Sequence, residues 1–135
     1  MFTSKRKINF YDCDPAGILF YAKIYELCHS VYEEMIKNFG LNENYWTNED
    51  YVVPIIHSEA TYHKPLVYNS FVEIELSVSS ISTSAFKLAY SCKNDNGELC
   101  VEVKTIHVFV DKKTWKKKQI KEEVREGLEK YLKNS

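Results

Sequence analysis

Two carboxylates separated by one residue, Asp12 and Asp14, are the side chains of this sequence best placed to do chemistry. Apolar residues lie on both sides of them, at Phe10 and from Ile18 to Tyr21. These neighbours indicate a partly buried loop, where a carboxylate needs hydrogen-bond partners or has a chemical task. We therefore take this loop as the first candidate for a functional site.

Two roles are open for Asp14. Its carboxylate can cap the N-terminus of a following helix, or it can act as a general base or nucleophile on a bound substrate. Asp12 is expected to be structural and to accept backbone N–H groups within the loop. Cys13 has no evident base beside it in the sequence, so we do not expect a nucleophilic thiol.

His29 and Glu33 are possible metal ligands, because they stand four residues apart and share one face of a helix. Together with Asp14 they form a partial set of metal ligands, but no further ligand follows at a recognisable spacing. We therefore predict no metal site.

The carboxylate loop is expected to connect a strand to a helix. Residues 2–11 alternate as in a strand, and an amphipathic helix follows from about residue 21 until Gly40 ends it. Its apolar side chains recur at steps of three and four residues, a pattern typical of a helix that lies across a sheet. They are Ile24, Leu27, Cys28, Val31, Met35, Ile36 and Phe39.

The rest of the chain is predicted to be mostly strands. Residues 94–97 favour a hairpin turn, a change of parity near Lys104 suggests a bulge, and a final helix is expected over residues 120–132. The order β-α-β-β-β-β-α predicts an α+β fold in which a long antiparallel sheet wraps around one central helix. The alternating segments expected to form strands after the helix are 51–62, 72–78, 86–92 and 99–110.

Length and composition limit the function classes. The 135 residues fit a single domain, residues 1–135, and the net charge of −1 argues against nucleic-acid binding through bulk charge. No apolar run approaches the roughly 20 residues of a membrane helix, and the N-terminus does not resemble a secretory signal. The four cysteines lack C-x-x-C spacing, so we expect free thiols. Together, these features predict a cytoplasmic protein without a membrane partner.

The segment from Asp12 to Ile18 reads Asp-Cys-Asp-Pro-Ala-Gly-Ile. Together with the element order, it resembles the 4-hydroxybenzoyl-CoA thioesterase family of the hotdog fold. The resemblance implies that Asp14 is the catalytic carboxylate and that Gly17 lets the backbone approach the substrate. It also implies that the backbone N–H of Tyr21 holds the thioester carbonyl.

This chain departs from the family at three helix positions. Family members often carry an asparagine where this chain has Lys23 and an aromatic residue where it has Ile24, and some place an acidic side chain at the position of His29. The departures at Lys23 and Ile24 change the shape of the substrate pocket rather than its chemistry, whereas the acidic side chain in those other members contacts the hydroxyl of an aromatic acyl group. The segments Cys28 to Tyr32 and Pro54 to His57 are similar to the 1,4-dihydroxy-2-naphthoyl-CoA thioesterase branch.

Three side chains are candidates for contacts with the substrate. His29 faces the acyl group or, alternatively, solvent on the helix surface. His57 lines the pocket or, alternatively, is a hydrogen-bonded core or interface histidine. Lys64 is a candidate for binding the phosphates of coenzyme A. The lysine-rich connection over residues 111–121 is either a second phosphate-binding candidate or a solvated connector.

The resemblance implies an acyl-CoA thioesterase that hydrolyses an aromatic acyl-CoA, such as 1,4-dihydroxy-2-naphthoyl-CoA or 4-hydroxybenzoyl-CoA, to free acid and CoA. Asp14 would act as nucleophile or general base without a metal or organic cofactor, since coenzyme A is part of the substrate. The alternatives are a short-chain acyl-CoA thioesterase of the Tol-Pal-associated type, a hotdog hydratase or dehydratase, and an acyl-thioester binding protein. Family members pair through an edge strand, so we expect a homodimer or homotetramer.

Overall fold

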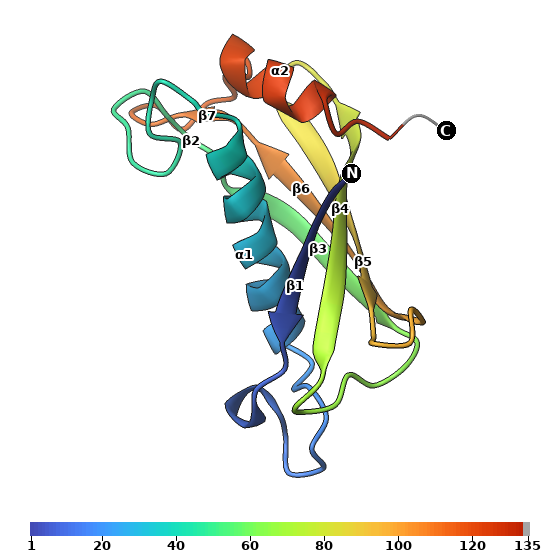
Figure 1. The fold of residues 1–135 in the computed structure, drawn as a ribbon. Helices are drawn as coiled ribbons and strands as arrows, with labels where there is room; N and C mark the ends of the chain where they lie inside the picture. The colour runs from blue at the N-terminus through green and yellow to red at the C-terminus, as the bar shows by residue number, and fades with distance from the viewer. Residues whose placement is uncertain (134–135) are drawn as a thin grey trace.

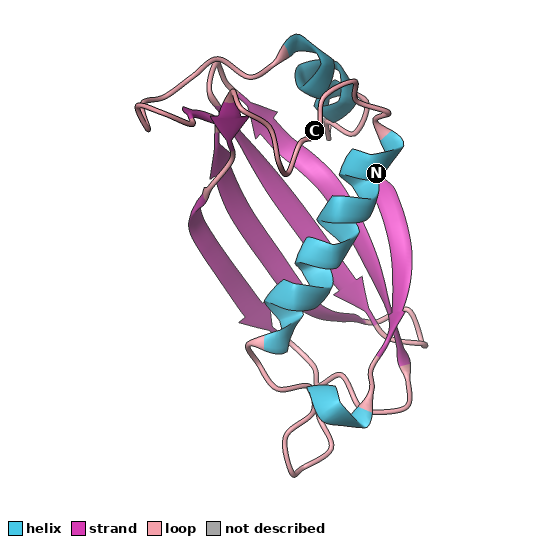
Figure 2. Cartoon of the chain, turned by 90° about the vertical axis from the view of Figure 1, so that its left-hand side faces the viewer, coloured by secondary structure: helices cyan, strands magenta, loops and turns pink. Residues whose placement is uncertain are grey.

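Five antiparallel strands form one sheet in the computed structural model, which describes residues 1–133 (Figure 1). The strand order is β1-β4-β5-β6-β3, and α1 (Lys23–Asn38) lies across one face (Figure 2). This is the predicted arrangement of a long antiparallel sheet around a central helix. The strands are β1 (Phe2–Lys7), β3 (Ile55–Tyr62), β4 (Phe71–Ile81), β5 (Ala85–Lys93) and β6 (Leu99–Val108).

Short elements complete the fold. β2 pairs with β7 at the C-terminal end of α1, and α2 packs beside β4 near the same end (Figure 1). The strand predicted over residues 51–62 is therefore divided, because its first two residues pair with β7 instead of β6. The short elements are η1 (Phe10–Asp12), β2 (Tyr51–Val52), β7 (Val110–Asp111) and α2 (Glu122–Glu129).

The bulge predicted near Lys104 is wrong. β6 pairs with β5 in unbroken register from Val108 opposite Ala85 to Val101 opposite Cys92. The apolar residues of this segment change from odd to even positions because two polar residues at odd positions of β6, Thr105 and His107, face the core and are buried. The register shifts lie elsewhere, one of them in β3 between Ile55 and His57.

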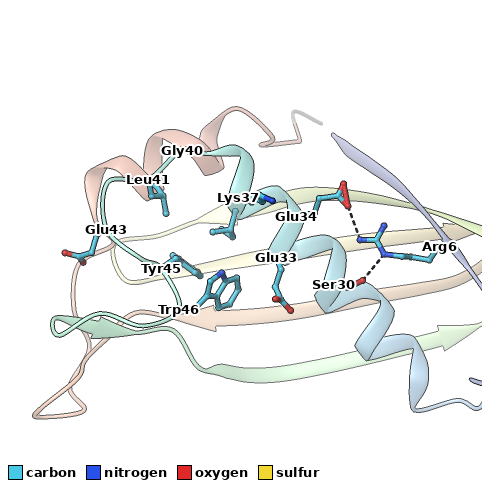
Figure 3. Close-up of a pocket in the computed structure, with 11 residues that line it drawn as sticks. Arg6, Ser30, Glu33, Glu34, Lys37, Gly40, Leu41, Glu43, Tyr45 and Trp46 are labelled. Atoms are coloured by element: carbon cyan, nitrogen blue, oxygen red, sulfur yellow. Dashed lines mark hydrogen bonds and ion pairs between the residues drawn. The ribbon is translucent and has the colours of Figure 1, made fainter.

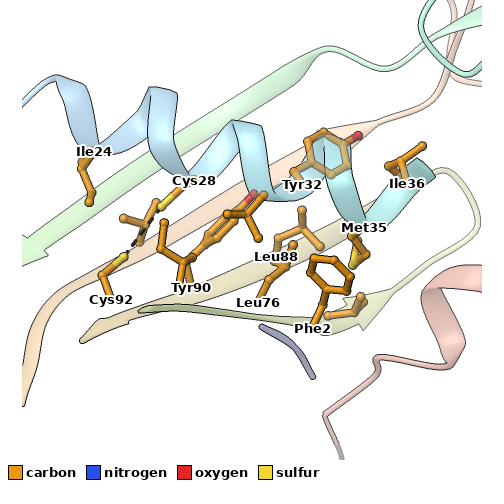
Figure 4. Packing of buried hydrophobic residues seen from close by; sticks show 14 of the residues in the cluster. Phe2, Ile24, Cys28, Tyr32, Met35, Ile36, Leu76, Leu88, Tyr90 and Cys92 are labelled. Atoms are coloured by element: carbon orange, nitrogen blue, oxygen red, sulfur yellow. Dashed lines mark hydrogen bonds between the residues drawn. The ribbon is translucent and has the colours of Figure 1, made fainter. Parts of the chain in front are cut away.

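The core lies between α1 and the inner face of the sheet (Figure 4). Ile24, Val31 and Met35 from the predicted helix stripe are completely buried. Cys28 and Cys92 face each other across this core with their Sγ atoms 3.9 Å apart, and all four cysteines are free thiols, as predicted. Among the described residues, no helix is long and apolar enough to cross a membrane.

The two edge strands of the sheet, β1 and β3, differ in how far other parts of the chain cover them. β1 is held against α1 by Arg6, whose guanidinium lies 2.9 Å from Glu34 and whose Nε donates to Ser30 at 3.1 Å. This ion pair lowers the pKa of Glu34. It borders a cavity of about 610 Å³ outside α1 that does not include Asp14 (Figure 3). At the other edge, most of β3 is exposed.

Candidate active site

The loop between β1 and α1 is a tight turn held by backbone hydrogen bonds. The Gly17 N–H donates to the Asp14 carbonyl at 2.9 Å, and the Asp14 N–H donates to the Ile18 carbonyl at 3.0 Å. Gly17 has a φ of +78°, which a side chain would disfavour. The Leu19 N–H then donates to the Leu66 carbonyl at 2.7 Å, which anchors the loop to the segment before β4.

Asp12 stabilises the start of this loop. It is buried, and its Oδ2 accepts the backbone N–H of Asn9 at 3.0 Å. Its carbonyl accepts the N–H of Phe20 at 2.9 Å, so the chain before and after the turn is held together at Asp12. These contacts agree with the structural role expected from the sequence.

Asp14 is half-buried at the turn. Its Oδ1 accepts the backbone N–H of Ala16 at 2.9 Å, while within residues 1–133 its Oδ2 receives no hydrogen bond. The carboxylate does not cap α1, because that helix begins two residues after Tyr21, at Lys23, and has no side-chain cap. The capping alternative is therefore excluded, and one carboxylate oxygen is available for chemistry.

A cavity of about 460 Å³ brings three of the predicted site residues together: Asp14, Tyr21 and Lys64. Gly17 does not line it but shapes the turn that presents Asp14. The remaining wall is mostly apolar, which favours binding of an organic group beside the carboxylate. The other lining residues are Ile18, Leu19, Phe20, Tyr62, His63, Pro65, Leu66 and Val101.

The N-terminus of α1 supplies a hydrogen-bond donor next to this cavity. In the described part of the chain, the Tyr21 N–H has no acceptor, and it precedes a helix whose dipole places partial positive charge at this end. The Tyr21 carbonyl is held by a hydrogen bond from the Tyr62 hydroxyl. This hydrogen bond fixes the backbone next to the Tyr21 N–H.

Lys64 is paired in this structure. Its ammonium group contacts the Glu98 carboxylate, and hydrogen bonding within the pair raises the pKa of Lys64 and lowers that of Glu98. Both side chains are substantially exposed, so solvent screens the pair. A phosphate can therefore compete with Glu98 for this cation.

His29 and His57 lie outside the cavity of Asp14. His29 lines a separate cavity of about 290 Å³, and its Nδ1 lies 3.0 Å from the Glu33 carboxylate. His57 is exposed on the sheet face away from α1, with Glu59 3.6 Å away. A single chain therefore does not bring either histidine to Asp14.

The lysine-rich connection lies at the opposite end of α1 from the Asp14 loop (Figure 1). Part of its charge is paired there, since Lys118 lies 2.6 Å from Asp50 and Lys121 contacts the same carboxylate. Within residues 1–133, no group of three or more histidine, cysteine or acidic side chains could hold a metal ion.

Sequence reasoning missed several polar side chains between α1 and the sheet. Tyr62 reaches across to the start of α1, while Tyr90, Thr105 and His107 lie at inward-facing strand positions. The polar residues at alternating positions of β6 were a usable signal, because a buried polar side chain in a core requires a reason.

Comparison with known proteins identifies the family. A family model described as the thioesterase-like superfamily matches residues 8–128. A 1,4-dihydroxy-2-naphthoyl-CoA hydrolase of Crocosphaera subtropica is 28% identical over 82% of this chain and 83% of its own. One of Prochlorococcus marinus is 32% identical over 84% of this chain and 77% of its own.

Solved structures share the fold at lower identity. A 1,4-dihydroxy-2-naphthoyl-CoA thioesterase from Synechocystis superposes with a TM-score of 0.88 at 21% identity, over 94% of each chain. A Staphylococcus aureus protein solved in complex with CoA gives 0.89 at 14% identity, over 99% of this chain and 87% of its own. These likenesses confirm the hotdog fold, and with the match over residues 8–128 they show that the chain belongs to the thioesterase-like superfamily.

Proposed function

We propose that this chain is a thioester hydrolase that cleaves an aromatic acyl-CoA to the free acid and coenzyme A. The observation that carries the proposal is that Asp14 and Tyr21 line one largely apolar cavity. Within residues 1–133, one carboxylate oxygen of Asp14 and the backbone N–H of Tyr21 have no hydrogen-bond partner. The names of the relatives from Crocosphaera subtropica and Prochlorococcus marinus support the aromatic class.

The chemistry needs an oxygen donor and a group that stabilises the oxyanion. The Asp14 carboxylate either attacks the thioester carbon, forming an anhydride that water hydrolyses, or takes a proton from an attacking water. The Tyr21 N–H donates to the oxyanion as it forms, an interaction worth about 3–4 kcal/mol in such sites. Lys64 binds a phosphate of coenzyme A. No metal or organic cofactor takes part in this scheme.

A panel of CoA esters tests the proposal through release of free thiol. We expect the highest kcat/KM with 1,4-dihydroxy-2-naphthoyl-CoA or 4-hydroxybenzoyl-CoA, and lower values with benzoyl-CoA and with short and long straight-chain esters. A preference for short straight-chain esters would support the alternative short-chain thioesterase. Failure to release thiol from any ester would contradict the proposal.

Hydration of an unsaturated ester is the second candidate, and the His29–Glu33 pair on α1 is the observation that favours it. That chemistry commonly uses a histidine and a carboxylate near the central helix. The panel therefore includes crotonyl-CoA, whose hydration is followed by loss of its conjugated absorbance. Hydration without thiol release would replace hydrolysis as the proposed activity.

We propose that the chain assembles at least as a homodimer and, as the favoured state, as a homotetramer. We also propose that it is located in the cytoplasm. The β3 edge supports pairing because it leaves Ile55 and Ile56 exposed, and the four free cysteines suit a reducing compartment. Exposed aromatic side chains around the Asp14 loop offer further contact area. They are Phe10, Tyr11, Phe20, Tyr21 and Tyr68.

Light scattering tests this assembly. We expect two or four times the chain mass of 15.9 kDa. Ile56→Lys should shift the mass toward the monomer, because a charge on an edge strand opposes pairing. Asn96→Lys adds the same charge at the exposed turn between β5 and β6 and should leave the mass unchanged. A monomeric parent protein would contradict the proposal.

A further inference from the structure

Residues 112–121 are the most basic stretch of the chain. Six of its 18 lysine and arginine residues lie there, and no acidic residue does. Because the net charge of the whole chain is −1, the remaining residues carry seven more negative than positive charges. Positive charge is therefore concentrated on one connection and is not spread over the surface. The six lysines are Lys112, Lys113, Lys116, Lys117, Lys118 and Lys121.

Only part of this charge is used within the chain. Lys118 and Lys121 contact the Asp50 carboxylate and thereby fasten the connection to the loop before β2. The Lys112 ammonium group donates to a backbone carbonyl at 2.7 Å, a contact that leaves its charge uncompensated. The other three lysines are exposed and have no ion-pair partner within residues 1–133, so their charge is directed to solvent. They are Lys113, Lys116 and Lys117.

A tight turn over residues 110–117, which we call the lysine hairpin, presents these three side chains. The Asp111 carbonyl accepts the Trp115 N–H, and the Asp111 N–H donates to the Lys116 carbonyl, each at 2.8 Å. Its Oδ1 accepts the N–H groups of Lys113 and Thr114, both at 2.9 Å. The last two hydrogen bonds lower the pKa of Asp111, so its carboxylate is ionised at neutral pH and holds the hairpin in one shape.

Trp115 lies in this hairpin in an unusual backbone conformation. Its φ is +60°, in the left-handed region that a bulky residue rarely adopts and that glycine adopts at no steric cost. The side chain is 62% exposed, so the turn does not use the indole ring for packing. A strained backbone that directs a large apolar ring into solvent indicates a contact outside the chain.

The lysine hairpin follows β7 at the end of the molecule away from the Asp14 loop (Figure 1). The 16 residues of α1 separate these two ends and correspond to a length of about 24 Å. Since the Debye length at physiological salt is about 8 Å, charges at the Asp14 end are screened from the hairpin. Contact through the hairpin consequently leaves the Asp14 cavity accessible at the other end.

An anionic lipid bilayer is the partner whose chemistry fits an exposed tryptophan among unpaired lysines. Its surface potential attracts lysines, each of which strengthens binding about fivefold, and its headgroup layer accepts an indole ring without a preformed pocket. A stable protein interface covers roughly 800 Å² on each partner, which is more than one small hairpin offers. A single-stranded nucleic acid binds in a groove that follows its backbone, and a projecting hairpin is not a groove.

We propose that the lysine hairpin docks the protein on the surface of an anionic phospholipid bilayer. Trp115 enters the headgroup layer, and the three unpaired lysines contact the lipid phosphates. The protein stays peripheral, since the expectation of no membrane partner came from the lack of a spanning segment and that lack does not oppose surface contact. Docking of this kind does not depend on the proposed hydrolysis.

Co-sedimentation of the full chain with vesicles tests the docking. At about 0.1 M salt, vesicles of equal parts phosphatidylcholine and phosphatidylglycerol should bind the parent about a hundredfold more tightly than phosphatidylcholine vesicles, and about 1 M salt should remove this preference. Replacing the three unpaired lysines by glutamine should weaken binding to the anionic vesicles about a hundredfold. Glutamine at three exposed strand lysines, Lys5, Lys87 and Lys104, removes the same charge elsewhere and should have little effect. Equal binding to both vesicle types, or equal loss in the two triple variants, would overturn the proposal.

Trp115→Gly examines the aromatic anchor, and glycine suits the φ of +60° at this position. Binding to the anionic vesicles should weaken about tenfold through the lost apolar contact, while Tm should equal or exceed that of the parent. Tryptophan emission of the parent should shift to shorter wavelength on these vesicles, and the variant, which retains Trp46, should show no shift. Unchanged vesicle binding would overturn the anchor, and a lowered Tm would show that the ring has a structural role instead.

Two other phosphate-bearing ligands are separated from lipid by binding measurements. Calorimetry with free coenzyme A should give the same Kd for the parent and for the variant that lacks the three unpaired lysines. Weaker binding of coenzyme A by that variant would assign these lysines to the substrate and overturn the docking proposal. Tighter binding of the parent to a single-stranded oligonucleotide than to anionic vesicles, compared per phosphate, would replace lipid with nucleic acid.

Discussion

Asp14→Asn is expected to lower kcat for CoA-ester hydrolysis by about 10³-fold or more while leaving ester affinity within about threefold. Asparagine keeps the shape of the side chain and can still accept the Ala16 N–H at 2.9 Å through its carbonyl oxygen. It cannot attack the thioester as a carboxylate or take a proton from water. Steady-state thiol release gives kcat, and calorimetry with an unreacted ester gives affinity.

Asp12→Asn is the matched control, because it makes the same chemical change two residues away in the same loop. Asp12 accepts the Asn9 N–H and faces the backbone, not the cavity, so this variant should lose some stability and keep hydrolysis within about tenfold of the parent. Comparable loss of kcat in both variants would show that loop shape, not the Asp14 carboxylate, is responsible. Substantial hydrolysis by Asp14→Asn would place the catalytic group elsewhere.

The central helix and the carboxylate loop were predictable because their signals are local. The apolar stripe of α1 has the helical period, and Gly17 occupies a backbone conformation that favours glycine. A turn defined by such residues holds its own side chains in place. Asp14 and Tyr21, which lie at the two ends of this turn, line one cavity together with Lys64.

The strand residues were harder to place, since alternation assigns a side chain to a face only if the register is continuous. In β3 the pairing with β6 shifts between Ile55 and His57, so the alternation of faces is interrupted there. His57 is consequently exposed on the face away from α1. In β6 the opposite error occurred: inward-facing Thr105 and His107 are polar, so an uninterrupted strand looked like one with a bulge. The register shift in β3 and the inward-facing polar residues of β6 both depend on how the strands pair and pack, which the local sequence pattern does not determine.

Acidification from pH 7 to pH 4.5 is expected to reduce the free energy of unfolding by about 2.5 kcal/mol through His107 alone. Burial lowers the pKa of this histidine from 6.5 to about 3 in the folded chain. Between these values the unfolded state binds a proton that the folded state does not, so stability falls as the pH falls through 6.5. Urea unfolding at a series of pH values measures the change.

Carboxylates contribute little in this window. Hydrogen bonds and ion pairs lower the pKa values of Glu34, Asp50, Glu98 and Asp111 from ordinary values of 3.8 or 4.5, so their stabilisation is lost mainly below pH 4.5. The raised pKa values of the paired lysines lie far above neutrality and do not change the slope here. The decrease above pH 4.5 can therefore be assigned to the buried imidazole.

His107→Gln tests that assignment, because glutamine can keep a hydrogen bond to Thr105 but does not titrate. This variant should be less stable than the parent at pH 7, since the stacked ring on Phe86 is lost, yet it should lose less than about 1 kcal/mol between pH 7 and pH 4.5. His57→Gln removes an exposed histidine and should retain the full decrease. An equal decrease in His107→Gln and the parent would mean that His107 is not held neutral.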